Sequence, residues 1–117
     1  MSDRARREAR GRRAEWLAAW YLRLKGWRVL ASRVRTVRGE IDLIARRGRT
    51  VAFVEVKWRE HAADLGGAID HHRLRRVQAA MEGVAHRYVP QGFDRRIDVL
   101  LLAPGRMPRH IVNATLS

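Results

Sequence analysis

Two short segments of the sequence carry acidic side chains at a spacing that suits a hydrolytic metal site. Glu40 and Asp42 are two residues apart, and Glu55 and Lys57 are also two residues apart. In an extended strand, residues two apart project from the same face. Each segment therefore presents its two charged groups on one side, and the four groups can act together only if the segments are neighbours.

A tight hairpin would make the two segments neighbours. Residues 47–50 read Arg-Gly-Arg-Thr, and Gly48 can adopt the positive φ that a two-residue hairpin turn requires. With Gly48 and Arg49 in the turn, Asp42 is predicted to lie opposite Glu55. The same register places Glu40 opposite Lys57, so that all four side chains share one face. The prediction depends on the register, because a slip of one residue would move one strand's pair to the other face.

Such an arrangement needs a counter-charge. Two carboxylates about 4 Å apart repel by about 4 kcal/mol at an effective dielectric constant near 20. Mg²⁺ is a hard cation that binds one or two carboxylates together with waters and phosphate oxygens. We therefore expect Asp42 and Glu55 to hold Mg²⁺ (or Mn²⁺) and Lys57 to orient or deprotonate the attacking water in phosphodiester cleavage. The alternative is the solvated face of an ordinary amphipathic hairpin, although a solvated face in this chain would be expected to carry arginine.

The overall charge points to a polyanionic partner. Lys and Arg number 25 against 12 Asp and Glu, which gives a formal net charge of +13. A field of this sign attracts nucleic acid, and arginine suits phosphate oxygens geometrically. An arginine-rich solvated surface would have the same composition, and net charge does not tell whether a nucleic acid is held or cut.

Length and composition predict one domain spanning residues 1–117, with a flexible basic N-terminus over residues 1–11. The absence of cysteine excludes disulfides and thiolate metal sites. No apolar run approaches the roughly 20 residues that a membrane span requires, and no secretory signal is evident. We therefore expect no membrane partner and a cytoplasmic localisation.

The elements that must position the acids follow from hydrophobic periodicity. A helix is predicted over residues 12–25, with strands over 27–35, 40–46 and 51–58. A second helix over 69–88 and strands over 97–102 and 110–114 follow. The inward stripe of the second helix is predicted to be Leu74, Val77, Met81, Val84 and Tyr88. The order α-β-β-β-α-β-β is typical of an α/β fold with a mixed sheet and helices packed against it.

The apolar residues of the first helix and the aspartate of the late strand are interpreted as structural or as interface residues. The apolar stripe of the first helix, Leu17, Trp20, Tyr21 and Leu24, is predicted to face the core. Trp16 and Trp20 are interpreted as core residues or anchors of a homodimer interface rather than as base-stacking platforms. Asp98 is interpreted as structural.

The segments RGEIDLIA at residues 38–45 and FVEVK at residues 53–57, with Glu15 in the first helix and RIDV at residues 96–99, resemble the YraN family of uncharacterised proteins. That family is similar to the restriction-endonuclease-like nucleases with a (P)D…(D/E)xK motif and to archaeal Holliday-junction resolvases. The resemblance covers nearly the whole chain. It implies a restriction-endonuclease-like mixed β-sheet flanked by helices.

Residue by residue, the resemblance implies metal ligation by Asp42, Glu55 and the backbone carbonyl of Val56, with Lys57 orienting water. Glu15 is implied as an outer carboxylate, while Glu40 pairs with Lys57 or binds a second ion. Four arginines are expected to contact nucleic-acid phosphates, although as part of a solvated face they would need no function: Arg38, Arg59, Arg73 and Arg76.

Three functions remain open at the level of sequence. The first is a metal-dependent endonuclease that hydrolyses nucleic-acid phosphodiester bonds, with DNA and branched structures as the favoured substrates. The alternative is a non-catalytic, basic nucleic-acid-binding protein with a vestigial nuclease site. The third is a homodimeric scaffold that assembles through the tryptophan-bearing helix.

Overall fold

The chain forms a mixed α/β structure in the order predicted from the sequence. The structure, a computed structural model, describes residues 2–60 and 70–116. Its elements are α1 (Asp3–Leu24), β1 (Arg28–Thr36), β2 (Gly39–Arg47), β3 (Thr50–Trp58), α2 (His71–Tyr88), β4 (Asp94–Leu102), β5 (Arg109–Ile111) and the 3₁₀ helix η2 (Ala114–Leu116). All predicted strands are present, although β4 begins three residues earlier than expected and β5 is shorter. Residue 69, the predicted start of the second helix, lies outside the described residues.

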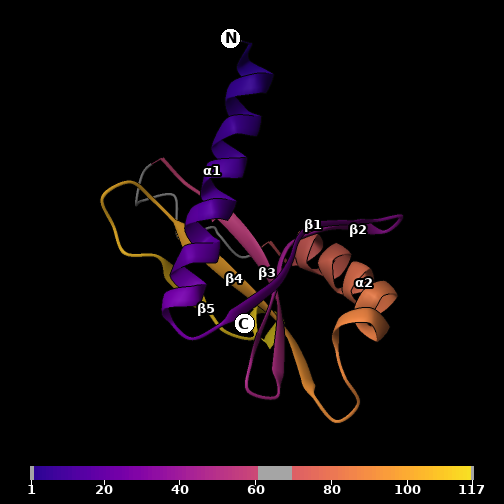
Figure 1. Ribbon diagram of the computed structural model, residues 1–117. Helices are drawn as coiled ribbons and strands as arrows, with labels where there is room; N and C mark the ends of the chain where they lie inside the picture. The colour runs from indigo at the N-terminus through magenta and orange to yellow at the C-terminus, as the bar shows by residue number, and fades with distance from the viewer. Residues whose placement is uncertain (1, 61–69, 117) are drawn as a thin grey trace.

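The five strands form one sheet in the order β1-β2-β3-β4-β5. Neighbouring strands are antiparallel except for β3 and β4, which are parallel and are connected through α2. A parallel pair requires a long crossover, which α2 supplies. Figure 1 shows the two helices on opposite sides of the sheet, so that the molecule has three layers.

Two hydrophobic clusters occupy the two interfaces of these layers. Alternation along β3 sends Val51 and Phe53 toward α2 and Ala52 and Val54 toward α1. The predicted inward stripe of α2 is confirmed, since all of its members lie in or against the cluster on that side. No helix in the described part of the chain is long and apolar enough to cross a bilayer.

The predicted core stripe of α1 is wrong except at Tyr21, which packs against the cluster on that side of the sheet. The side chains that pack on the sheet are small or slender ones from a different face of the helix, namely Ala14, Ala18, Ala19 and Leu22. Trp16 is 61% exposed, Trp20 47% and Leu24 82%, and Leu17 is also exposed. Alanines allow the helix to approach the sheet closely, and this packing decides the orientation of the helix although tryptophan and leucine are more hydrophobic.

The first helix also begins earlier than predicted. The Ser2 side chain caps its start by accepting a hydrogen bond from the N–H of Ala5 at 3.1 Å, and Arg4 and Glu8 form an ion pair one turn apart. The helix therefore begins at Asp3 and not at Arg12. In Figure 1 its N-terminal half projects beyond the sheet. Flexibility of residues 1–11 stays a prediction.

The register of the central hairpin is confirmed over the paired part of the strands. Arg47 pairs with Thr50 and Leu43 pairs with Val54, as a two-residue turn at Gly48 requires. Gly48 has a φ of 61°. The pairing of β2 with β3 ends at Leu43, whereas the pairing of β2 with β1 continues to the tip of their own hairpin at Thr36 and Gly39.

Candidate active site

The sheet forks at the point where the acidic residues begin. Beyond the pair Leu43–Val54, β2 remains with β1 and β3 remains with β4. The Asp42 carboxylate lies in this fork and accepts a hydrogen bond from the N–H of Val56 at 2.8 Å. A side-chain oxygen thus replaces a backbone acceptor of β2, and this contact fixes the position of Asp42.

Three carboxylates converge at the fork. Glu15 from α1 and Glu40 and Asp42 from β2 each offer one oxygen, and these three oxygens lie within 4.8 Å of one another. At this separation, two unit charges repel by about 3 kcal/mol at an effective dielectric constant near 20. The repulsion is weaker at Glu40, whose side chain is 42% exposed and therefore screened by water. We call Glu15, Glu40 and Asp42 the acidic cluster.

Glu55 lies next to the acidic cluster but is not one of its members. It is 2% exposed. Its counter-charge is the guanidinium of Arg73, with which it forms an ion pair. The predicted direct cross-strand pair of Asp42 and Glu55 is therefore wrong, because the strands separate one position before it.

The neighbouring acids affect the pKa of Asp42. Burial, together with the charges of Glu55 and Glu15, raises the pKa of Asp42 from 3.8 to about 6 against the lowering effect of the Val56 hydrogen bond. Glu55 and Asp42 are thus close enough to interact even though they are not paired residues of the ladder. A carboxylate with a raised pKa beside other acids is typical of a site that binds a cation or a proton.

Arg33 is a member of this site that was not expected from the sequence. Its Nε donates a hydrogen bond to Glu15 Oε2 at 2.6 Å. This bond, together with the charges of Glu15, Glu40 and Asp42, raises the pKa of Arg33 despite the opposing effect of burial. Its φ is 51°, in the left-handed region that non-glycine residues rarely adopt.

The position of Arg33 could have been found from the register of the first hairpin. Ser32 pairs with Leu43 and Val34 pairs with Ile41, so Arg33 lies across from Asp42. In the protein without a bound cation, Arg33 balances the charge of Glu15, as Arg73 balances that of Glu55.

The predicted pair of Glu40 and Lys57 is also wrong. Glu40 forms an ion pair with Arg35 at 3.3 Å instead. Lys57 follows Glu55 by two residues on β3 and therefore projects from the same side of that strand. The pKa of Asp70, at the start of α2, is lowered by its hydrogen bond from the Arg73 N–H and also by the charge of Lys57. The ammonium group of Lys57 is thus close to the first turn of α2, on the side of the fork where Arg73 lies.

The four arginines expected to contact phosphates lie in different places. Arg73 and Arg76 line, with Glu40, a cavity of about 130 Å³ between α2 and β2. Arg38 is exposed in the turn between β1 and β2, and Arg59 follows β3 and donates a hydrogen bond to the carbonyl of Trp58. Two of the four therefore flank the acidic cluster.

The donor set fits a hard divalent cation. The group of metal-ligating side chains found among the described residues consists of carboxylates alone. The raised pKa of Asp42 indicates that the protein itself compensates the negative charge of this carboxylate only in part. Carboxylate oxygens are the ligands that Mg²⁺ and Mn²⁺ prefer.

This geometry leads to a testable dependence of stability on pH and metal. In metal-free protein, the unfolded chain releases the Asp42 proton near pH 3.8, while the folded protein keeps it until about pH 6. The folded state then binds more protons across this interval, so the free energy of unfolding should fall with rising pH by up to about 3 kcal/mol. Mg²⁺ should reverse the loss, and the rise in Tm on adding Mg²⁺ should be larger at pH 7.5 than at pH 5.

Thermal denaturation in EDTA and in Mg²⁺ at both pH values measures this effect. Asp42→Asn has no charge to titrate and serves as the matched control, in which the difference between the two pH values should shrink. An equal Mg²⁺ effect at both pH values in the wild-type protein would contradict the assignment of Asp42 to the cation site.

The mixed sheet, its two flanking helices and the fork define a restriction-endonuclease-like fold. The structure is similar to that of Archaeoglobus fulgidus Hjc, described as a Holliday junction resolvase from an archaeal hyperthermophile. The TM-score is 0.57 at 19% sequence identity, and the match covers 86% of this chain and 73% of that one. At this identity the similarity establishes the fold.

The chain belongs to UPF0102, an uncharacterised protein family whose model matches residues 14–102. A UPF0102 protein of Sphingopyxis alaskensis is 64% identical over 110 residues, which cover 94% of this chain and 95% of that one. One from Erythrobacter litoralis is 62% identical, with 92% of each chain covered. The resemblance to the YraN family inferred from GEIDLIA and FVEVK is thereby confirmed.

Proposed function

We propose that this protein is a divalent-metal-dependent endonuclease that hydrolyses phosphodiester bonds in DNA. The observation that carries the proposal is the fork between β2 and β3, where Asp42 lies among Glu15, Glu40 and the buried Glu55. A protein with a net charge of +13 has no evident structural reason to gather four acids at one end of its sheet. The fold that it shares with a Holliday junction resolvase favours branched DNA as the substrate class.

Each residue of the site has a proposed task. Asp42 and Glu55 hold the cation with the backbone carbonyl of Val56, and Glu15 and Glu40 complete the negative field around it. A bound Mg²⁺ or Mn²⁺ would stabilise charge on the phosphoryl group and lower the pKa of the attacking water. Lys57 orients this water or removes its proton. Arg73 and Arg76, beside Glu40, contact the phosphates that flank the scissile one.

A specific observation favours a second candidate, a DNA-binding protein with a vestigial site. Arg33 and Arg73 already neutralise Glu15 and Glu55 within the protein. A site whose acids are balanced internally can be stable without any cation. In this case the protein would bind DNA through its arginines and would not cleave it.

Cleavage assays distinguish the two functions. Linear, flapped and four-way DNA substrates are incubated with the protein in EDTA, Mg²⁺ or Mn²⁺. The nuclease proposal expects cleavage that requires a divalent cation and is greatest on a branched substrate. Salt-dependent binding without cleavage under any cation would support the second candidate instead.

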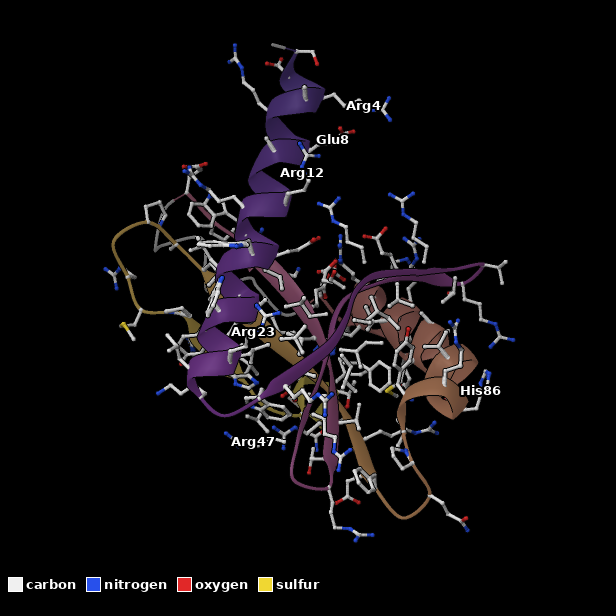
Figure 2. All side chains as sticks on the ribbon, in the orientation of Figure 1. Arg4, Glu8, Arg12, Arg23, Arg47 and His86 are labelled. Carbon is white, nitrogen blue, oxygen red and sulfur yellow. The ribbon has the colours of Figure 1, made fainter. Side chains whose placement is uncertain are left out.

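The projecting half of α1 supplies a prediction about binding. Figure 2 shows Arg4 and Arg12 on the part of α1 that extends beyond the sheet, while Glu15 at the acidic cluster lies further along the same helix. Replacing three arginines of this part should weaken binding to duplex DNA about 10-fold or more at 0.1 M salt. It should also reduce the slope of log K against log salt by up to about 2.7, because each of the three lost phosphate contacts accounts for about 0.9.

The variant carries alanine at Arg4, Arg6 and Arg12, and the measurement is a salt titration of binding in EDTA. The matched control removes the same charge at the end of the sheet far from the fork, at Arg28, Arg87 and Arg95. Equal losses in the two triple variants would show that net charge alone determines binding.

A further inference from the structure

A cavity next to the acidic cluster has an aromatic wall. It has a volume of about 210 Å³ and lies between α1 and the first hairpin, lined among others by Glu15, Trp16, Arg23, Ser32 and Leu43. Glu15 belongs to both the cavity and the acidic cluster. Ser32 and Leu43 are the chain neighbours of Arg33 and Asp42, so the cavity opens directly beside the fork.

Trp16, which lines this cavity, and Trp20, one turn further along α1, are both exposed. Trp16 and Trp20 are in edge-to-face contact, with ring centroids 6.3 Å apart, and the guanidinium of Arg23 lies 5.3 Å from the centre of the Trp20 ring. Two exposed tryptophans and an arginine on successive turns present ring faces together with positive charge. Proteins bind unpaired bases with this combination, since a base stacks on the aromatic ring and the cation contacts its phosphate.

We infer that Trp16 and the adjoining cavity receive an unpaired base of the DNA substrate, so that the enzyme selects sites where a nucleotide lies outside the duplex. The inference rests on the proposed function for the identity of the partner. Trp16 stacks on the base, Arg23 contacts its phosphate, and the neighbouring acidic cluster acts on the backbone beside it. A branch point or a gap supplies such a nucleotide, whereas a continuous duplex must unstack a base at a cost.

Charge favours DNA over a second copy of the chain as the occupant of this surface. Each copy carries +13, so a symmetric contact through α1 would bring two strongly basic molecules together. The helix bears Arg12, Arg13 and Arg23 around the tryptophans, all exposed. A polyanion complements this surface, while a homodimer would need counter-charges that the described part of α1 does not supply beyond Asp3, Glu8 and Glu15.

The test compares binding to two DNAs in EDTA, where cleavage does not occur. One is a duplex with a short single-stranded gap, and the other is the fully paired duplex of the same length. Wild-type protein should bind the gapped DNA about 10-fold more tightly, with quenching of tryptophan fluorescence. Trp16→Leu should lose most of this preference and of the quenching, and its affinity for the paired duplex should change less than about 2-fold.

Two further variants separate stacking from packing. Trp16→Phe keeps an aromatic face and should retain most of the preference. Leu24→Ala removes another exposed apolar side chain from the same helix, away from the cavity, and should have no effect. If Trp16→Leu keeps the preference for gapped DNA, the inference is overturned. A sedimentation shift from dimer to monomer in this variant, with no change in DNA selectivity, would also overturn it.

The outcomes also distinguish this inference from the proposed function. If the protein cleaves DNA with a substrate preference that does not depend on Trp16, the stacking inference is rejected and the nuclease proposal stands. If binding of gapped DNA depends on Trp16 but the protein cleaves no DNA in Mg²⁺ or Mn²⁺, the stacking inference stands and the nuclease proposal is rejected.

Discussion

Asp42→Asn should reduce DNA cleavage on the order of 1000-fold or more while leaving the protein folded. Asparagine has the shape of aspartate and still offers an oxygen to the Val56 N–H, so the fork should keep its geometry. It lacks the charge of the proposed cation ligand, so the variant would lose both the activation of water and the stabilisation of the phosphoryl group that a bound cation would supply. Single-turnover cleavage at saturating protein measures the chemical step apart from binding.

The control for this variant is Asp94→Asn. Asp94 is an exposed aspartate at the opposite end of the sheet, and its replacement changes the net charge by the same amount. It should cleave like the wild-type protein, and both variants should bind DNA within about 3-fold of it. Cleavage by Asp42→Asn at more than a tenth of the wild-type rate would exclude Asp42 as an essential ligand.

Asp98→Ala should reduce the free energy of unfolding by about 3–5 kcal/mol without involving the acidic cluster. Asp98 is 0% exposed. Its carboxylate accepts hydrogen bonds from the Arg96 guanidinium and the Asn113 N–H, and it lies 2.7 Å from the His110 ring nitrogen. Removing it leaves Arg96 and the Asn113 N–H without this acceptor near the buried ring of Trp27. Urea denaturation followed by circular dichroism measures the loss.

The pH dependence of this loss follows from the pKa of Asp98. Burial alone would raise the pKa, but the contacts with His110, Asn113 and Arg96 hold it below its ordinary value of 3.8. The stabilisation is thus fully present above pH 3.8 and disappears as the pH falls through the lower, folded-state value. The difference between wild type and variant should shrink as the pH falls below 3.8.

Two comparisons test this interpretation. Asp98→Asn keeps an acceptor and should lose less stability than Asp98→Ala. Asp94→Ala, on the same strand but exposed, should change the free energy of unfolding by less than about 0.5 kcal/mol. A loss of 1 kcal/mol or less in Asp98→Ala would show that the contacts of Asp98 add little to the stability of the fold.

Much of the architecture could be predicted because it depends on local patterns. The turn at Gly48 requires a positive φ, and the alternation in Val51–Val54 is that of a buried strand. Both follow from the order of residues, and with them the register from Leu43–Val54 to the turn. The inward stripe of α2 has regular spacing and large side chains, and it packs as predicted.

The interpretation of α1 failed for a physical reason. Hydrophobicity ranks Trp20 and Leu24 above Ala14 and Ala18, but the face of α1 that packs on the sheet carries three alanines and Leu22. The volume available between a helix and a sheet is a property of the assembled layers. For this reason the exposed tryptophans beside the acidic cluster could not be recognised from periodicity.

The residues proposed for metal chemistry could be listed from the sequence, namely the acids of GEIDLIA and FVEVK, Lys57 and Glu15. The hairpin that brings the two segments close could also be predicted from it. Tertiary structure alone decided how these residues meet. The sheet forks at Asp42, Glu15 joins from α1, and Arg33 and Arg73 balance the charge. The reason is that backbone pairing is set by local chemistry, whereas the place where a ladder ends depends on the twist of the sheet and on the helices packed against it.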